Sequence, residues 1–246
     1  MASLYTMQAV KKGYIGLSFS NGVPQLVPPG GLEVALGANP LSIAAPAHCD
    51  FLVVDMSTTA VTFAKIKKYA DKRADLPKGW ALNKKGEVEQ DPDKAMIFKK
   101  LCPLGAEQSH KGFGLALLVE VLSGVLADSN YGSKIPNTLG KCKCEPLNLG
   151  HGFIAINPEK FVPNFATRLS KLLNQLRDME SAECTKSILV PGDRERMHMK
   201  KVDSEGGIRY SRDQLEVLET LSRKLCVPFL EISVSLAQVR QNKKKS

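Results

Sequence analysis

The chain has 246 residues, of which 43% are hydrophobic and 24% charged, a composition typical of a globular protein with one large or two small domains. Its apolar runs are shorter than the roughly 20 residues of a membrane-spanning helix, and no signal peptide is recognisable, so we expect a cytoplasmic protein without a membrane partner. The formal net charge is +9, but the lysines are spread along the chain and only 6% of residues are aromatic. Nucleic acid is therefore the weakest candidate partner, and a small polyanionic molecule is the alternative.

The six cysteines do not have the spacing of a metal site. Cys142 and Cys144 are separated by one residue, whereas paired zinc ligands are usually separated by about two to four. The other cysteines are scattered, at positions 49, 102, 184 and 226. We therefore expect reduced thiols and predict no metal site.

Short apolar runs bounded by turn residues predict strands in the first part of the chain. These runs lie at residues 14–20, 41–45, 51–57 and 151–157, and a short hairpin is predicted within residues 76–88. The first run is separated from the second by Asn21-Gly22 and by the Pro-Pro-Gly-Gly loop at residues 28–31. Residues 58–74 have apolar positions at helical spacing, and residues 5–12 indicate the end of a helix that stops at Gly13.

Residues 109–114 and the apolar run from Leu115 to Ala127 that follows them form the predicted central helix, and the composition of the run indicates burial on nearly all sides. Ser109, His110 and Lys111 stand at its head, just before two glycines. Unpaired backbone N–H groups and a lysine at a helix start can bind an anion such as a phosphate group. The alternative is an ordinary core helix with a solvated lysine at its end.

From residue 158 onward the pattern is helical. One apolar face repeats at helical spacing, at Phe165, Leu169, Leu172, Leu173, Leu176 and Met179. Asp213 is the predicted N-cap of a last helix, which carries Leu215, Leu218, Leu221 and Leu225. We predict an α+β protein with a boundary between residues 1–157 and 158–246, because strands and helices do not alternate and no GxGxxG follows the first strand.

Seven motifs together resemble one family of enzymes. They lie at residues 12–16, 28–31, 36–41, 54–57, 76–81, 110–115 and 190–195. Their order and spacing are similar to those of the malate/L-lactate dehydrogenase family, also called L-sulfolactate dehydrogenase-like, which includes ureidoglycolate dehydrogenase and 2,3-diketogulonate reductase. The resemblance extends over nearly the whole chain.

The resemblance implies an NAD(P)-binding domain at residues 1–157, built on a mostly antiparallel, non-Rossmann sheet, and a C-terminal helical part of the substrate and dimer domain. It implies an intertwined homodimer that binds NAD or NADP and interconverts a 2-hydroxy acid and a 2-keto acid. It also implies cofactor contacts from three segments. Their residues are Phe51, Leu52, Val53, Val54, Asp55, Met56 and Ser57, then His110 and Lys111, and finally Gly192, Asp193 and Arg194.

The chain departs from the family pattern on the substrate side. Family members carry a Ser-His-Gly-x-x-Arg motif and a later histidine, which supply the proton donor and the arginine that holds the substrate carboxylate. The histidines of this chain, at positions 48, 110, 151 and 198, match neither position, so no catalytic residue is identified. Asn21 is a candidate for the substrate side, with a turn residue as the alternative.

The resemblance therefore predicts the cofactor half of a malate- or lactate-type dehydrogenase, from a truncated gene model, a splice form or a partial chain. A dehydrogenase of this kind needs a hydride acceptor, a group that exchanges the hydroxyl proton and a cation for the carboxylate. The alternative is a catalytically impaired protein that binds a dinucleotide or a partner.

Overall fold

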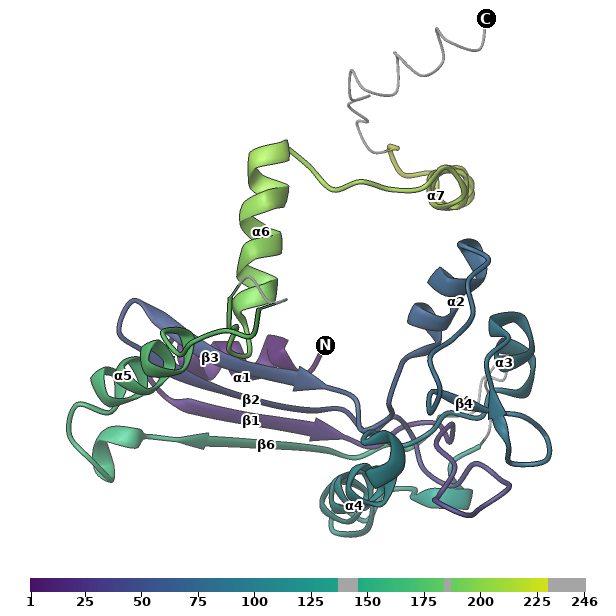
Figure 1. Cartoon of the computed structure of the whole chain (residues 1–246), viewed down its shortest axis with the longest axis horizontal. Helices are drawn as coiled ribbons and strands as arrows, with labels where there is room; N and C mark the ends of the chain where they lie inside the picture. The colour runs from purple at the N-terminus through teal and green to yellow at the C-terminus, as the bar shows by residue number, and fades with distance from the viewer. Residues whose placement is uncertain (137–145, 184–186, 230–246) are drawn as a thin grey trace, which may run out of the picture. The chain divides into compact units, whose positions relative to one another are not determined.

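The computed structural model describes residues 1–136, 146–183 and 187–229, and its contacts divide it into two units, Met1–Arg194 and Glu195–Ser246 (Figure 1). Cys142 and Cys144 lie outside the described residues. Among the helices that the structure describes, none combines the length and apolarity needed to cross a membrane.

The first unit is built on a four-stranded antiparallel sheet with the order β3-β2-β1-β6. Its strands are β1 (Ile15–Ser20), β2 (Leu41–Ala47), β3 (Asp50–Met56) and β6 (His151–Ile156). Leu17 of β1 pairs with Ile43 on one side and with Ile154 on the other. The predicted strands are confirmed, and β3 and β6 form the two edges of the sheet (Figure 1).

Helices α1 (Ser3–Val10) and α5 (Phe165–Arg177) pack on opposite faces of this sheet. The Asp55 carboxylate accepts a hydrogen bond from the Ser3 amide (3.1 Å), whereas Asp50 binds Arg177 of α5 (2.8 Å). Side chains alternate between the faces of a strand, so residues five positions apart lie on opposite sides. Glycine at position 16 lets α1 approach, because an added Cβ would lie 2.8 Å from the Thr6 backbone.

A smaller lobe of the first unit has a hydrophobic core of its own. Its elements are α2 (Phe63–Asp71), β4 (Ala81–Leu82), β5 (Val88–Glu89) and α3 (Pro92–Phe98), with β4 and β5 paired as a hairpin. Fully buried apolar residues fill it, namely Ile66, Leu76, Ala81, Ala95 and Leu101, and Tyr69 meets Trp80 edge-on. The predicted hairpin is confirmed, and the predicted helix at 58–74 is present but shorter.

The central helix comprises α4 (Ser109–Glu120) and a π-helical turn, η2 (Val121–Val125). Burial on nearly all sides was expected, and this is wrong for one side. Gly112, Ala116, Val119 and Glu120 face the protein. The other side exposes Leu117, Leu118, Val121, Val125 and Leu126 by 45–74%. An apolar composition alone does not show how much of a helix surface the fold covers.

Short 3₁₀ turns complete the first unit, at η1 (Ala106–Gln108), η3 (Gly132–Lys134) and η4 (Pro158–Lys160). Residues 188–190 and the turn that follows them also belong to this unit. The structural division therefore falls after Arg194, and the expected functional boundary after residue 157 stays a prediction.

The second unit consists of most of α6 (Asp193–Glu205) and α7 (Arg212–Leu225). The predicted N-cap of the last helix, Asp213, is wrong. Ser211 caps it instead, because its hydroxyl accepts from the Gln214 amide (3.3 Å) and the Gln214 side chain accepts from the Ser211 amide (2.9 Å). This capping box, Ser-x-x-Gln, is present in the sequence two residues before the predicted cap.

Candidate functional site

Strand β3 is an edge strand, and one side of its backbone is turned away from the sheet. The Val53 amide donates to the Pro191 carbonyl (3.4 Å), which lies outside the sheet. Antiparallel pairing alternates the direction of backbone groups, so Phe51, Val53 and Asp55 direct their N–H and C=O groups to this free edge. The predicted cofactor strand therefore has backbone hydrogen-bonding groups outside the ladder.

The turn at residues 190–193 docks against this edge. The amide of Asp193 donates to the Val190 carbonyl (3.0 Å), and the Val190 amide donates to the Asp193 carboxylate (2.9 Å). Gly192 is buried and has a φ of +100°, a conformation that favours glycine. Two of the predicted cofactor segments, β3 and the Gly192–Asp193 turn, are thus brought together.

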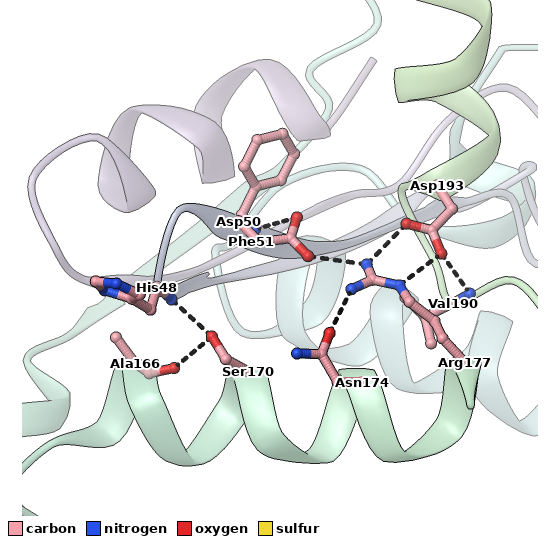
Figure 2. Close-up of polar contacts among 9 residues, drawn as sticks. All are labelled: His48, Asp50, Phe51, Ala166, Ser170, Asn174, Arg177, Val190 and Asp193. Carbon is pink, nitrogen blue, oxygen red and sulfur yellow. Dashed lines mark hydrogen bonds and ion pairs between the residues drawn. The ribbon is translucent and has the colours of Figure 1, made fainter. Parts of the chain in front are cut away.

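Arg177 of α5 joins this turn to β3 (Figure 2). Its guanidinium donates to both carboxylate oxygens of Asp193 (3.1 and 2.8 Å) and to Asp50 (2.8 Å). Asp193, and then Asp50, raise the pKa of the Arg177 guanidinium above its usual value, since both carboxylates favour its charged form. No sequence motif marked Arg177, and the only signal was a polar residue at the end of an otherwise apolar helix face.

The head of α4 lies beside the segment that follows β3. The Leu104 amide donates to the Thr58 carbonyl (2.9 Å), and Thr59 forms an isolated bridge with Pro103. Gly112, in the first turn of α4, packs directly on the Leu104 backbone. His110 and Lys111 are exposed there. The structure therefore connects the remaining predicted cofactor segment, His110 and Lys111, to the end of β3 through residues 103–104.

The predicted residues of β3 do not all face one ligand. Phe51, Val53 and Asp55 lie on the α1 face of the sheet, and Leu52, Val54 and Met56 on the α5 face. One oxygen of Asp55 is occupied by the Ser3 amide. Ser57, just after the strand, donates to the Thr59 carbonyl (3.2 Å) and accepts from the Thr59 hydroxyl (3.0 Å). A ligand at the free edge would therefore meet the backbone of Phe51, Val53 and Asp55 only.

Asn21, the predicted substrate-side residue, is 3% exposed. Its amide nitrogen donates to the Asn130 carbonyl (2.7 Å) and to Glu120 (3.4 Å), and its oxygen accepts from the Gly150 amide (2.9 Å). These bonds occupy the side chain within the protein and agree with a structural role. A substrate contact by Asn21 stays a prediction.

A buried carboxylate lies next to Asn21, at a position that in the sequence is only a polar interruption of an apolar run. Glu120 is 3% exposed and accepts from the Asn39 side chain (2.7 Å) and the Gly132 amide (2.7 Å). Asn39 has a φ of +37°, and its amide also donates to the Ala116 carbonyl (2.9 Å). Within the described residues, its oxygen is buried without a hydrogen-bond partner. This cluster ties α4 to both ends of the connection between β1 and β2 and to the segment that follows η2.

A pocket of about 350 Å³ opens beside Ser109 at the head of α4. Its walls come from the glycine- and proline-rich loop at residues 27–32, from the hairpin and from Cys102 and Pro103. Cys102 is buried, and this burial raises the pKa of its thiol to about 11. No group of three or more metal-ligating side chains gathers anywhere in the described part of the chain.

The thiol of Cys102 is expected to resist alkylation in the folded protein. At pH 8 a pKa of about 11 leaves a thiolate fraction about 200-fold below that of an ordinary thiol with a pKa near 8.5. Iodoacetamide labelling followed by peptide mapping should modify the exposed Cys49 and Cys226 first. Modification of Cys102 at the same rate as these two would show that its burial is wrong.

Comparisons with known proteins show the family to which the chain is similar. The model of the malate/L-lactate dehydrogenase family matches residues 1–219. A malate dehydrogenase of Pyrococcus abyssi is 32% identical over 238 residues, which are 94% of this chain and 64% of that protein. The NAD(+) ureidoglycolate dehydrogenase of Escherichia coli K12 is 31% identical over 207 residues, 83% of this chain and 57% of that protein.

Solved structures have the same fold. Malate dehydrogenase from Entamoeba histolytica superposes with a TM-score of 0.85 at 28% identity, over 94% of this chain and 66% of that one. Sulfolactate dehydrogenase from Methanocaldococcus jannaschii gives a TM-score of 0.81 at 30% identity, over the same shares of both chains. The chain spans somewhat less than two thirds of these relatives. By sequence and by its α+β, L-sulfolactate dehydrogenase-like fold, it belongs to the malate/L-lactate dehydrogenase family.

Proposed function

We propose that this chain is part of an NAD(P)-dependent oxidoreductase that interconverts a 2-hydroxy acid and a 2-keto acid, and that it supplies the cofactor side of the site. One observation carries the proposal: the Gly192 turn and the head of α4 both adjoin β3 or the segment directly after it. Relatives support either cofactor, because the Escherichia coli relative is named for NAD(+) and one from Chromohalobacter salexigens for NADP(+).

The residues present fit a dinucleotide. The first turn of α4 offers N–H groups and Lys111 to a diphosphate, and the edge of β3 offers the backbone of Asp55 to polar groups of the cofactor. Gly192 keeps the turn next to Val53 compact enough to close over a ligand. When bound, the nicotinamide accepts or donates the hydride, and the protein orients it and excludes water.

The substrate side is the less complete part of this proposal. His48 lies in the turn between β2 and β3, where its amide bonds Ser170, and His151 stacks with Phe153. Of the three histidines in the first unit, His110 is the one at the proposed cofactor site. These positions favour a second candidate function, a catalytically impaired protein that binds a dinucleotide or a partner.

A homodimer is the assembly that we propose. The apolar face of α5 is partly uncovered, because Leu172 is 51% and Leu176 37% exposed, whereas Leu173 is buried. The exposed side of α4 and η2 adds Leu118 and Val121. Exposed apolar patches favour association. Sedimentation analysis should therefore give a dimer or larger species, and a stable monomer at all concentrations would contradict this.

Replacing Lys111 by alanine is expected to weaken NADH and NADPH binding about 5- to 30-fold, the effect of one charge-assisted contact of about 1–2 kcal/mol. Nucleotide fluorescence titration measures this directly. Lys68→Ala is the matched control, because Lys68 is an exposed lysine on α2. Equal losses from both substitutions would mean that general positive charge, and not the head of α4, attracts the cofactor.

A further inference from the structure

We propose that Arg177 is a positioning residue of the cofactor site, which acts by holding the turn at residues 190–193 against β3. The proposal rests on the proposed function, because it assigns the turn to a cofactor site. Arg177 itself is on α5 and was not among the predicted cofactor residues. It acts through Asp193, which was.

The contacts place Arg177 at the junction of three segments. Asp50 at the start of β3 is 127 residues away in sequence, and Asp193 in the turn is 16 residues away. A long backbone bond, from the Val53 amide to the Pro191 carbonyl (3.4 Å), also joins the turn to the strand. Charge-assisted bonds in fork geometry are stronger than such a bond, so Arg177 supplies the stronger of these two connections.

The ion triad is largely shielded from water. The side chains of Arg177, Asp50 and Asp193 are 26%, 21% and 12% exposed. Both carboxylates bond the same nitrogen, Nη2, at 2.8 Å, so they face one another across a single cation. Without the guanidinium, two shielded negative charges would repel each other and push the turn away from the strand.

This geometry changes the role that the sequence suggested for Asp193. Its oxygens accept from Arg177 and from the Val190 amide, so they serve to shape the turn. A cofactor on this edge would then be contacted by the backbone of residues 191–194. Arg177 also stays fixed by Asn174, one turn earlier on α5, whose side-chain oxygen accepts from Nη1 (3.2 Å) (Figure 2).

The test compares Arg177→Met and Arg177→Lys with Arg168→Met, a control at an exposed arginine on the same helix. We expect Arg177→Met to raise the Kd for NADH about tenfold, because the docked turn would be populated only about one tenth of the time. Arg177→Lys should recover part of this, since a lysine restores the charge but not the fork. Arg168→Met should bind as the unchanged protein does.

Hydrogen exchange without NADH separates positioning from binding. In Arg177→Met, amides of residues 188–193 should exchange faster, while those of β1 and β2 stay protected. Unchanged exchange in the turn would overturn the proposal, and so would faster exchange with an unchanged Kd. If Arg177→Met does not fold, Asp50→Asn, which removes one charge from the triad, gives the same comparison.

The failure of the proposed function would look different. If the unsubstituted chain bound neither NADH nor NADPH, the cofactor site would be wrong, and with it the positioning role of Arg177. The exchange experiment would then still show whether Arg177 holds the turn. Binding by the unsubstituted chain together with a tenfold weaker Arg177→Met supports both proposals.

Discussion

Replacing Gly112 by alanine is expected to lower the free energy of unfolding by about 2–3 kcal/mol, the upper range for forcing a methyl group into a packed site. The added Cβ would meet the Leu104 carbonyl oxygen and lie 2.6 Å from the Leu104 nitrogen. Both are backbone atoms, so no flexible side chain can yield. Because Leu104 also bonds Thr58, the shift should reach the end of β3 and weaken NADH binding.

Gly114, two residues later on the same helix, is the matched control. An added Cβ there meets nothing within 4 Å. Alanine favours a helix over glycine by roughly 0.5–1 kcal/mol, so Gly114→Ala should be neutral or stabilising. Urea unfolding of the two variants measures the difference. Equal destabilisation by both would mean that α4 does not pack on Leu104 through Gly112.

The second large effect that we expect is slow turnover of substrate by the 246-residue chain. We expect it to reduce pyruvate or oxaloacetate about 10²- to 10⁴-fold more slowly than a chain that also carries the family's Ser-His-Gly-x-x-Arg segment, because general acid–base catalysis contributes about that factor. This corresponds to about 3–5 kcal/mol in the activation barrier. Without the arginine the KM for the keto acid should also be higher, since a bidentate carboxylate contact is lost.

A steady-state assay with several 2-keto acids compares the two chains. NADH binding by the shorter chain, measured in the same samples, shows that low turnover is not a failure to bind cofactor. His110 is the residue to replace if the shorter chain is active, because it is exposed at the proposed cofactor site. Full activity that survives His110→Ala would show that the catalytic residues have been misplaced.

Local patterns predicted the elements of this fold well. Apolar runs of five to seven residues located the sheet strands, because short apolar runs between turn residues are typical of strands. Seven motifs in order indicated the family, which the comparisons confirm. The burial of α4 was overestimated, since composition reports what a helix prefers and not which surface packs on it.

Long-range polar contacts were beyond sequence reasoning. The pairing of Arg177 with Asp50 and Asp193 depends on α5 crossing the sheet at one particular place. Glu120 resembled a polar interruption of an apolar helix, and only the fold shows that Asn21 and Asn39 surround it. In both cases at least one partner of the charged group lies about 80 to 130 positions away along the chain.

Hydrogen exchange with and without saturating NADH tests the proposed cofactor site along the edge of β3 most directly. We expect NADH to slow exchange in three segments, residues 51–58, 109–113 and 190–194, and to leave exchange in the β4–β5 hairpin unchanged. These are the edge of β3, the head of α4 and the turn held by Arg177. Protection confined to other parts of the chain, or none at saturating NADH, would contradict a cofactor site along this edge.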